Sequence, residues 1–154
     1  MSTQMEIRAF KNVNGENDEI SHVVKWYGYD VMAWLCGVRN RAAIKPLPHK
    51  HLSRQELCDF LDPRPPEKQQ SGADYFSTVS DFDRFSDDSF YLVKMSDILA
   101  ADLDQVVENR RVHGKTLPEG EGVKMTLREY LDGFEIQIEK LKSLGAETLL
   151  LRFY

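Results

Sequence analysis

Arg39 and Asn40 are the first residues along the chain whose types and spacing suit binding chemistry. They end the stretch 26–40, which reads Trp-Tyr-Gly-Tyr-Asp-Val-Met-Ala-Trp-Leu-Cys-Gly-Val-Arg-Asn. A guanidinium presents five donors in a planar fork, and beside an amide it can recognise a carboxylate, a phosphate or a base edge. The alternative is structural: Arg39 pairs with Asp30 or with carbonyl groups at a helix end and fastens the turn.

A second set of polar side chains follows closely and extends this candidate site. His49-Lys50-His51 places two imidazoles at i and i+2, on the same side of an extended segment. That spacing suits a metal, but a zinc or iron site needs a third ligand, and Asp59 and Asp62 are merely the nearest carboxylates. Exposed histidines are the commoner outcome, so we expect neither a metal nor another cofactor. The expected ligand- or partner-binding residues are Arg39, Asn40, Arg41, Lys45, His49 and His51.

An acidic segment later in the chain is the other candidate interaction surface. Asp81, Asp83, Asp87 and Asp88 briefly resemble a calcium loop. Counting from Asp81, however, serine and leucine stand where such a loop needs its glycine and its bidentate glutamate, so the calcium interpretation fails. Carboxylate pairs here could hold Mg²⁺, or the four aspartates could face a partner. We expect the partner-facing surface.

Aromatic and sulfur-containing side chains around the first apolar stretch allow two interpretations each. Trp26, Tyr27, Tyr29 and Trp34 could stack on a nucleotide base, or they could form the core, which we favour. Cys36 lies within an apolar segment, which indicates a small core residue rather than an attacking thiolate. The sequence also lacks the Gly-x-Ser-x-Gly, Gly-x-x-x-x-Gly-Lys-Ser/Thr, Gly-x-Gly-x-x-Gly and Cys-x-x-Cys motifs. Their absence makes an enzyme the less favoured class, although catalytic groups can assemble from distant residues.

Composition places the chain among soluble globular proteins. It has 154 residues, 42% of them hydrophobic and 29% charged, with a formal net charge of −5. This length suits one domain spanning 1–154. Two cysteines indicate reduced thiols rather than a disulfide scaffold. The longest apolar run, 31–36, is far below the roughly 20 residues of a membrane span, and the first residues lack signal-peptide features. We expect a cytoplasmic protein with no membrane partner.

The elements that must position these residues begin with a hairpin. Residues 5–10 alternate apolar and polar types, which predicts a half-buried strand. A second strand is expected over 19–26, after the turn signal Asn14-Gly15, with a connection (12–18) longer than two residues. Residues 29–36 then predict a short helix that ends at a left-handed Gly37.

The middle of the chain contains one helix and a long loop. Ser53 and Glu56 form a capping box, which predicts a helix through about residue 61. Prolines and a Gln-Gln-Ser-Gly run predict a loop over 62–73. Residues 90–93 predict a strand.

The last third predicts two more helices and a final strand. Ser96 is expected to cap a helix through about Arg110, with an apolar stripe that includes Val106 and Val107. A loop is expected over 111–123. A second capping box, Thr126 and Glu129, opens a helix that ends at Gly145, and 147–154 predicts a strand. These elements predict an α+β fold in which a small mixed or antiparallel sheet joins the N-terminal hairpin to the C-terminal strand and packs with three to four helices.

Five segments together resemble a family of uncharacterised small proteins encoded by phages and prophages, many of which begin Met-Gly-Cys-Asp-Ile-His. The closest likeness is Tyr-Asp-x-x-Ala-x-Leu-x-Gly-Val-Arg-Asn at 29–40, supported by the strand at 5–10, Leu47-Pro48 with Ser53, and the segments 89–103 and 141–154. This chain has Lys-Pro-Leu-Pro where members usually carry Arg-Gly-Leu-Pro, and it lacks their opening residues. The resemblance implies a viral origin and the cytoplasm of an infected bacterium.

The expected function follows from these features together. We expect a phage accessory protein that acts by binding and obstructs a host factor, such as a component of a restriction or CRISPR defence system. The alternative is a small nucleotide- or nucleic-acid-processing enzyme, metal-dependent in one version, in which Arg39 holds phosphate and His49 or His51 acts as acid, base or ligand. A third interpretation is a homo-oligomer that associates through the acidic segment.

Overall fold

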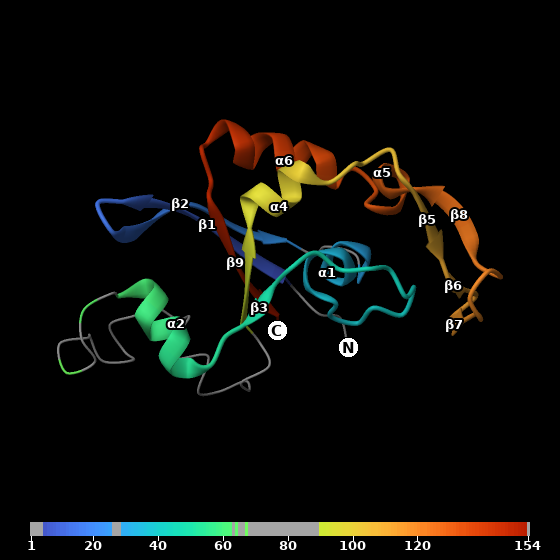
Figure 1. Cartoon of the computed structure of the whole chain (residues 1–154), viewed down its shortest axis with the longest axis horizontal. Helices are drawn as coiled ribbons and strands as arrows, with labels where there is room; N and C mark the ends of the chain where they lie inside the picture. Colours follow the sequence, from blue (N-terminus) through green and yellow to red (C-terminus); the bar gives the residue numbers. More distant parts are fainter. Residues whose placement is uncertain (1–4, 26–28, 63, 65–66, 68–89, 154) are drawn as a thin grey trace.

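The computed structural model describes residues 5–25, 29–62, 64, 67 and 90–153, and its centre is a five-stranded antiparallel sheet (Figure 1). The strand order is β2-β1-β9-β4-β3. The strands are β1 (Met5–Val13), β2 (Glu16–Lys25), β3 (Lys50–His51), β4 (Phe90–Lys94) and β9 (Thr148–Phe153). The first strand pairs with the last, Met5 opposite Phe153, which confirms the predicted α+β fold and the sheet that joins both ends of the sequence.

The N-terminal hairpin is tighter than its sequence suggested. Val13 pairs with Glu16, so only Asn14 and Gly15 form the turn, with φ of 53° and 86°. Two successive positive φ angles define the turn that matches the twist of antiparallel strands, and Asn-Gly is its preferred sequence. The predicted longer connection over 12–18 was therefore wrong, because the polar residues on either side of the turn continue the strands.

Residues 5–10 of β1 are buried on both faces of the strand, whereas their alternating pattern predicted a half-buried strand. Glu6 and Arg8 are only 3% and 5% exposed. The Glu6 carboxylate accepts a hydrogen bond from Arg8 Nε at 2.7 Å and contacts Arg152 Nη1 at 3.3 Å and His22 Nε2 at 2.7 Å. Buried charges are tolerated when they are paired in this way, so a polar residue in the pattern did not signal a solvent-facing side.

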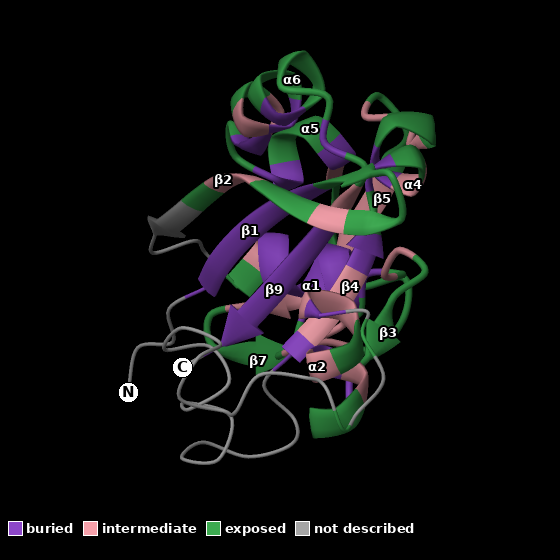
Figure 2. Ribbon diagram, turned by 90° about the vertical axis from the view of Figure 1, so that its left-hand side faces the viewer, coloured by how far each residue is buried: buried purple, intermediate pink, exposed green. Residues whose placement is uncertain are grey.

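Most helices cover one face of the sheet and enclose the larger core. These are α1 (Tyr29–Cys36), α4 (Met95–Ala100), α5 (Leu127–Tyr130) and α6 (Phe134–Ser143). Apolar side chains from all four pack against the inward residues of β1, β4 and β9. Figure 2 shows β9 and most of β1 in the colour of buried residues. The predicted helix over 29–36 is confirmed, and Gly37 ends it with a φ of 72°.

Helix α2 (Arg54–Leu61) covers part of the opposite face and closes a smaller core. Its Leu57 packs with Phe10, Leu52, Phe90 and Leu150. The predicted capping box is confirmed, because the Ser53 side chain accepts from the Glu56 N–H and the Glu56 side chain accepts from the Ser53 N–H. Most of the loop predicted over 62–73 lies outside the described residues.

The helix predicted over 96–110 is confirmed only in its first part, because α4 ends at Ala100 and a small β arm replaces the rest. The expected cap was also wrong: the N-cap residue is Lys94, and Ser96 lies inside the helix. Strand β5 (Val106–Asn109) pairs with β8 (Val123–Thr126). The expected loop over 111–123 was also wrong in part: β6 (Arg111–Val112) pairs with β7 (Lys115–Thr116). We call 105–126 the β arm, and Figure 1 shows it to the right of the main sheet. The Asp102 carboxylate accepts from Asp104 N–H at 3.0 Å, a local turn that competes with continued helix.

The helix predicted after Thr126 is divided into α5 and α6. Asp132 and Gly133 lie between them with φ of 48° and 88°, which ends the first helical segment. The capping box of Thr126 and Glu129 is confirmed, and so is the strand predicted at the end of the sequence, observed as β9. The described residues thus contain five helical segments rather than the expected three or four.

Candidate functional site

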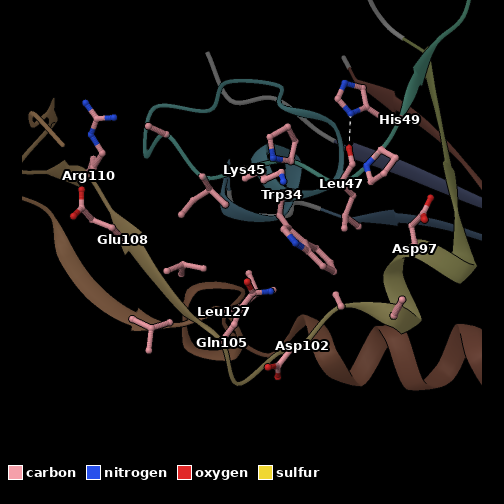
Figure 3. Close-up of a pocket in the computed structure, with 18 of the residues that line it drawn as sticks. Trp34, Lys45, Leu47, His49, Asp97, Asp102, Gln105, Glu108, Arg110 and Leu127 are labelled. Carbon is pink, nitrogen blue, oxygen red and sulfur yellow. Dashed lines mark hydrogen bonds between the residues drawn. The ribbon is translucent and has the colours of Figure 1, made fainter. Parts of the chain in front are cut away.

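An open cleft of about 1220 Å³ lies between the segment 43–49 and the elements α4 and β5 (Figure 3). The segment 43–49, which we call the proline wall, contributes Pro46 and Pro48. The opposite side consists of the end of α4 and the consecutive residues Gln105, Val106, Val107 and Glu108. Segments far apart in the sequence therefore form the two sides of the cleft.

The floor of the cleft is apolar. Trp34 from α1 and Leu127 from α5 are 2% and 1% exposed, and Figure 3 shows the indole directed into the cleft. The Leu47 N–H donates to the Trp34 carbonyl at 2.8 Å and so fixes the proline wall to the end of α1. The prediction that Trp34 belongs to the core is confirmed. The same prediction was wrong for Tyr29, which is 39% exposed. Trp26 and Tyr27 lie outside the described residues.

Carboxylates predominate among the charged residues around the cleft. Asp97, Asp102, Glu108 and Glu119 line it, against Lys45 and Arg110. The Glu108 carboxylate accepts from Gly120 N–H at 2.9 and 3.1 Å, and Arg110 Nε donates to the Leu117 carbonyl at 2.8 Å. Because these two side chains are held by the β arm, their charges have fixed positions. The cleft has a net negative charge and an apolar floor.

Asn40, one of the predicted binding residues, shapes the proline wall. Its side-chain Oδ1 accepts from Ile44 N–H at 2.9 Å, and its amide nitrogen donates to the Ile44 carbonyl. Both functional groups of the amide are therefore engaged with one residue of the wall. Asn40 acts as a positioning residue, and it orders the segment that carries Lys45 and His49.

Arg39 and Arg41 lie beside Tyr29, and neither lines the cleft. The Arg39 Nη1 donates to the Tyr29 hydroxyl at 3.3 Å, and the two guanidinium carbons lie 5.4 and 6.0 Å from the ring centroid. Arg39 is exposed and contacts Tyr29, whereas the structural alternative had paired it with Asp30 or with carbonyl groups at the helix end. The predicted site is therefore divided: Lys45 and His49 line the cleft, and the arginines form a separate exposed cluster.

Both histidines, His49 and His51, contact the ring of Tyr91 in β4. The His51 ring stacks on Tyr91 with centroids 5.1 Å apart, and the His49 ring meets it edge-on at 6.0 Å. His49 Nδ1 lies 2.7 Å from the Leu47 carbonyl (Figure 3). Within the described ranges, no group of three or more His, Cys, Asp or Glu side chains is placed to hold a metal ion. The predicted acidic residues Asp81, Asp83, Asp87 and Asp88 lie outside those ranges.

Cys36 is a core residue, as predicted. It is 4% exposed, and its Sγ contacts the Met32 carbonyl at 3.5 Å. Burial raises the pKa of the Cys36 thiol to about 12, so the thiolate needed for nucleophilic attack is scarce at neutral pH. Near the start of the same helix, burial and then the Asp132 charge raise the pKa of Asp30, although the Tyr130 hydroxyl donates to it and opposes that shift.

Sequence reasoning missed the α4 and β5 side of the cleft. The residues missed are Asp97, Asp102, Gln105, Glu108, Arg110 and Leu127. The available signals were the adjacent valines Val106 and Val107, which favour a strand, and Asp102, which favours a turn. We gave these signals less weight than the apolar stripe that includes Val106 and Val107, because that stripe favoured a helix.

No family model, curated protein or solved structure gives a significant match to this chain. The resemblance to small phage-encoded proteins therefore stays a prediction. No helix of the described residues has the length and apolar character needed to cross a bilayer.

Proposed function

We propose that this chain acts by binding, and that its cleft holds a segment of a partner protein. In the phage setting that the sequence resemblance implies, the partner is a host factor, such as a component of a defence system, and binding obstructs it. The observation that carries this proposal is the cleft itself, in which apolar lining residues, such as Pro46 and the exposed Val106 above the buried Trp34, are surrounded by charged side chains. Apolar surface with a few placed polar groups is the usual composition of a recognition site.

The charge of the cleft favours a protein over a nucleic acid as its occupant. Asp97, Asp102 and Glu119 would repel phosphate groups, whereas Lys or Arg side chains of a protein segment would be attracted. Charge complementarity of this kind raises association rates and excludes wrong partners. The partner segment should therefore be basic as well as apolar.

Charge-altering variants of the cleft test this proposal. Tagged wild-type protein is used to capture partners from lysates of phage-infected bacteria, beside Asp97→Asn/Asp102→Asn and Glu119→Lys. The asparagine at position 102 keeps an acceptor for the Asp104 N–H, so the local turn is retained. We expect both cleft variants to capture less of the same partner than wild type does.

Glu139→Lys is the matched control, because it reverses an exposed charge on α6, and residue 139 does not line the cleft. It should capture the partner as wild type does. Absence of any captured partner, or capture that the cleft variants leave unchanged, would contradict the proposal.

The arginine cluster supports a second candidate function, a nucleotide- or nucleic-acid-processing activity. Arg39 and Arg41 are both exposed beside one tyrosine, and no carboxylate of the described residues forms an ion pair with either. Arginine beside an aromatic ring is a common arrangement for holding phosphate or a stacked base. Titration of a labelled single-stranded oligonucleotide, together with assays of nucleotide consumption, compares wild type with Arg39→Ala/Arg41→Ala. This function requires consumption by wild type and weaker binding by the variant.

A further inference from the structure

Strand β5 has one open edge within the described residues, because it pairs only with β8. The Leu127 N–H donates to the Gln105 carbonyl at 2.9 Å, and these residues are opposite one another in the register of the pair. Hydrogen-bonded and non-hydrogen-bonded pairs alternate along an antiparallel ladder. The pairs that follow at 107 and 109 therefore bond to β8. The backbone N–H and C=O groups of Val106 and Glu108 consequently point away from β8.

These groups point toward the cleft. The Arg110 N–H, two residues beyond Glu108 and on the same side of the strand, donates to the Ala42 carbonyl at 3.1 Å. Ala42 immediately precedes the proline wall, so the open edge of β5 faces that segment. Val106 and Glu108 line one side of the cleft, and the proline wall lines the other. The hydrogen bond from Arg110 to Ala42 thus closes one end of the cleft. Beyond it, β5 and the proline wall separate.

Pairing of the proline wall itself with β5 is disfavoured, because several of its backbone groups are engaged or missing. The N–H and C=O of Ile44 are bonded to the Asn40 side chain. The Leu47 N–H donates to Trp34. The prolines at 46 and 48 have no N–H group. The outward groups of β5 therefore stay available to an occupant of the cleft.

We propose that the occupant is an extended segment of a partner protein that adds as a strand to the open edge of β5. This inference rests on the proposed function and specifies how the partner is bound. Addition of a strand to an exposed edge is a recurring mode of peptide recognition, in which backbone hydrogen bonds give affinity and alternate side chains give specificity. The four residues of β5 extend about 13 Å, so four to five residues of the partner pair with them.

The lining of the cleft determines the side chains that this segment carries. Alternate side chains of an added strand point into the cleft, where apolar lining residues such as Pro46 and Val107 accept apolar residues. Asp97 and Asp102 near one end and Glu119 of the β arm attract Lys or Arg. The partner segment is therefore linear, with apolar residues at every second position and basic residues beside them.

A displayed library of random nine-residue linear peptides, selected on the full chain, supplies the probes. Synthetic copies of the selected peptides are then titrated by fluorescence anisotropy against wild type, Val106→Pro and Val106→Ala. Proline removes the N–H that points into the cleft, and no hydrogen bond to β8 is lost. Val106 is 68% exposed, so neither substitution opens the core. We expect about tenfold or weaker binding by Val106→Pro and nearly unchanged binding by Val106→Ala.

Backbone N-methylation of the selected peptides tests the same hydrogen bonds from the ligand side and does not depend on the folding of a variant. Methylation at alternate positions should weaken binding to wild type, because only alternate N–H groups of an added strand face β5. Loss at every second position, together with the proline effect, supports the proposal.

Four results would overturn it. These are the absence of any selected peptide that binds wild type, equal binding by the proline and alanine variants, tolerance of methylation at every position, and a wild-type dimer that Val106→Pro converts to a monomer. Partner capture that is sensitive to Asp97→Asn/Asp102→Asn but not to Val106→Pro would retain the proposed function and reject strand addition. Peptide binding abolished by Val106→Pro, without any captured host protein, would reject the proposed partner and retain the strand-binding edge.

Discussion

Arg39 and Asn40 are neighbours in the sequence, but their side chains do different things. Asn40 turns inward and holds both backbone groups of Ile44, whereas Arg39 lies outside on Tyr29. A positive φ of 51° at Arg39 separates the directions of the two side chains. The residue types alone predicted a shared binding role, since both are good hydrogen-bonding groups. Which of the two side chains forms hydrogen bonds within the protein depends on the path of the backbone from residue 40 to Ile44.

Asp30 provides a pH-dependent prediction at the residue scale. Burial, with a smaller effect of the Asp132 charge, raises the pKa of Asp30 above its ordinary 3.8. The folded protein therefore binds this proton more tightly than the unfolded chain, and wild type loses stability as the pH rises through the folded-state value. Asp30→Asn removes that loss and keeps an acceptor for Tyr130. We expect Asp30→Asn to have a higher Tm than wild type at pH 7. The gain in the free energy of unfolding should be about 1 kcal/mol or less, because the negative charge of Asp30 at the start of a helix is partly favoured.

The advantage of Asp30→Asn should shrink as the pH falls and vanish below pH 3.8, the unfolded-state pKa, where Asp30 is protonated in both the folded and the unfolded protein. Thermal unfolding followed by circular dichroism at several pH values measures this. Asp18→Asn, a change at an exposed carboxylate on β2, is the control. A Tm difference between Asp30→Asn and wild type that is constant across the pH range would show that the Asp30 charge is not the cause.

Cys36 allows a second residue-scale prediction. With its pKa raised to about 12 and its side chain buried in α1, the thiol should resist alkylation in the native protein at pH 7. Mass spectrometry after a timed iodoacetamide pulse should find Cys36 unmodified until denaturant is added. Cys58 is partly exposed and serves as the internal comparison. Modification of Cys36 at the rate of a free thiol would contradict its placement in the core.

At the element scale, Gly122 is required where the chain closes the β arm. A Cβ atom at this position would lie 2.6 Å from the Asn109 carbonyl oxygen and 2.9 Å from Arg110 Cα. Backbone atoms cannot move aside as a flexible side chain can, so Gly122→Ala should force β5 and β8 apart. We expect a loss of about 1–3 kcal/mol in the stability of the arm. Chemical denaturation with amide NMR of the arm measures it.

The neighbouring substitution Glu121→Ala is the control, because this side chain is exposed. Since Glu108 and Arg110 belong to the arm and line the cleft, Gly122→Ala should also weaken peptide binding. Equal stability and equal binding for Gly122→Ala and Glu121→Ala would show that the close approach of the backbone at residue 122 has no consequence.

Elements with local signals could be predicted from the sequence, and those decided by distant contacts could not. The capping boxes at Ser53 and Thr126 and the glycine after α1 act within one turn of helix, and all three are confirmed. The stretch after Ser96 fits a helical stripe equally well, but the Leu127 N–H bonds to Gln105 and β8 pairs with β5. Tertiary pairing overrode the local pattern there.

The candidate site shows the same division. Lys45 and His49 were predicted as binding residues because proline and histidine indicate an extended, exposed segment, and both line the cleft. The carboxylates Asp97 and Asp102 were not predicted, because they reach the cleft only through the packing of α4 beside the proline wall. A single sequence contains no signal for which distant segment becomes the second side of a cleft.

At the scale of the whole molecule, the main sheet and the β arm differ in how they are held. Strand β9 lies between β1 and β4, and Leu149 and Leu151 within it are completely buried. The arm is attached through a few hydrogen bonds, including that from Arg110 to Ala42, and through the partly buried Val107 and Met125, whereas its Val106 and Val123 are 68% and 52% exposed. Less apolar burial therefore holds the arm than holds the main sheet.

This difference predicts two levels of protection in native-state hydrogen exchange. Amides of β1 and β9 should exchange only through global unfolding, whereas those of β5 and β8 should exchange through a smaller opening of lower free energy. Gly122→Ala should lower protection in the arm and leave β1 and β9 nearly unchanged. Exchange measured by NMR across a denaturant series separates the two levels, because global unfolding depends more steeply on denaturant. If all four strands gave one free energy and responded together to Gly122→Ala, the arm would be part of a single cooperative unit, and the cleft could not widen for a partner without unfolding the sheet.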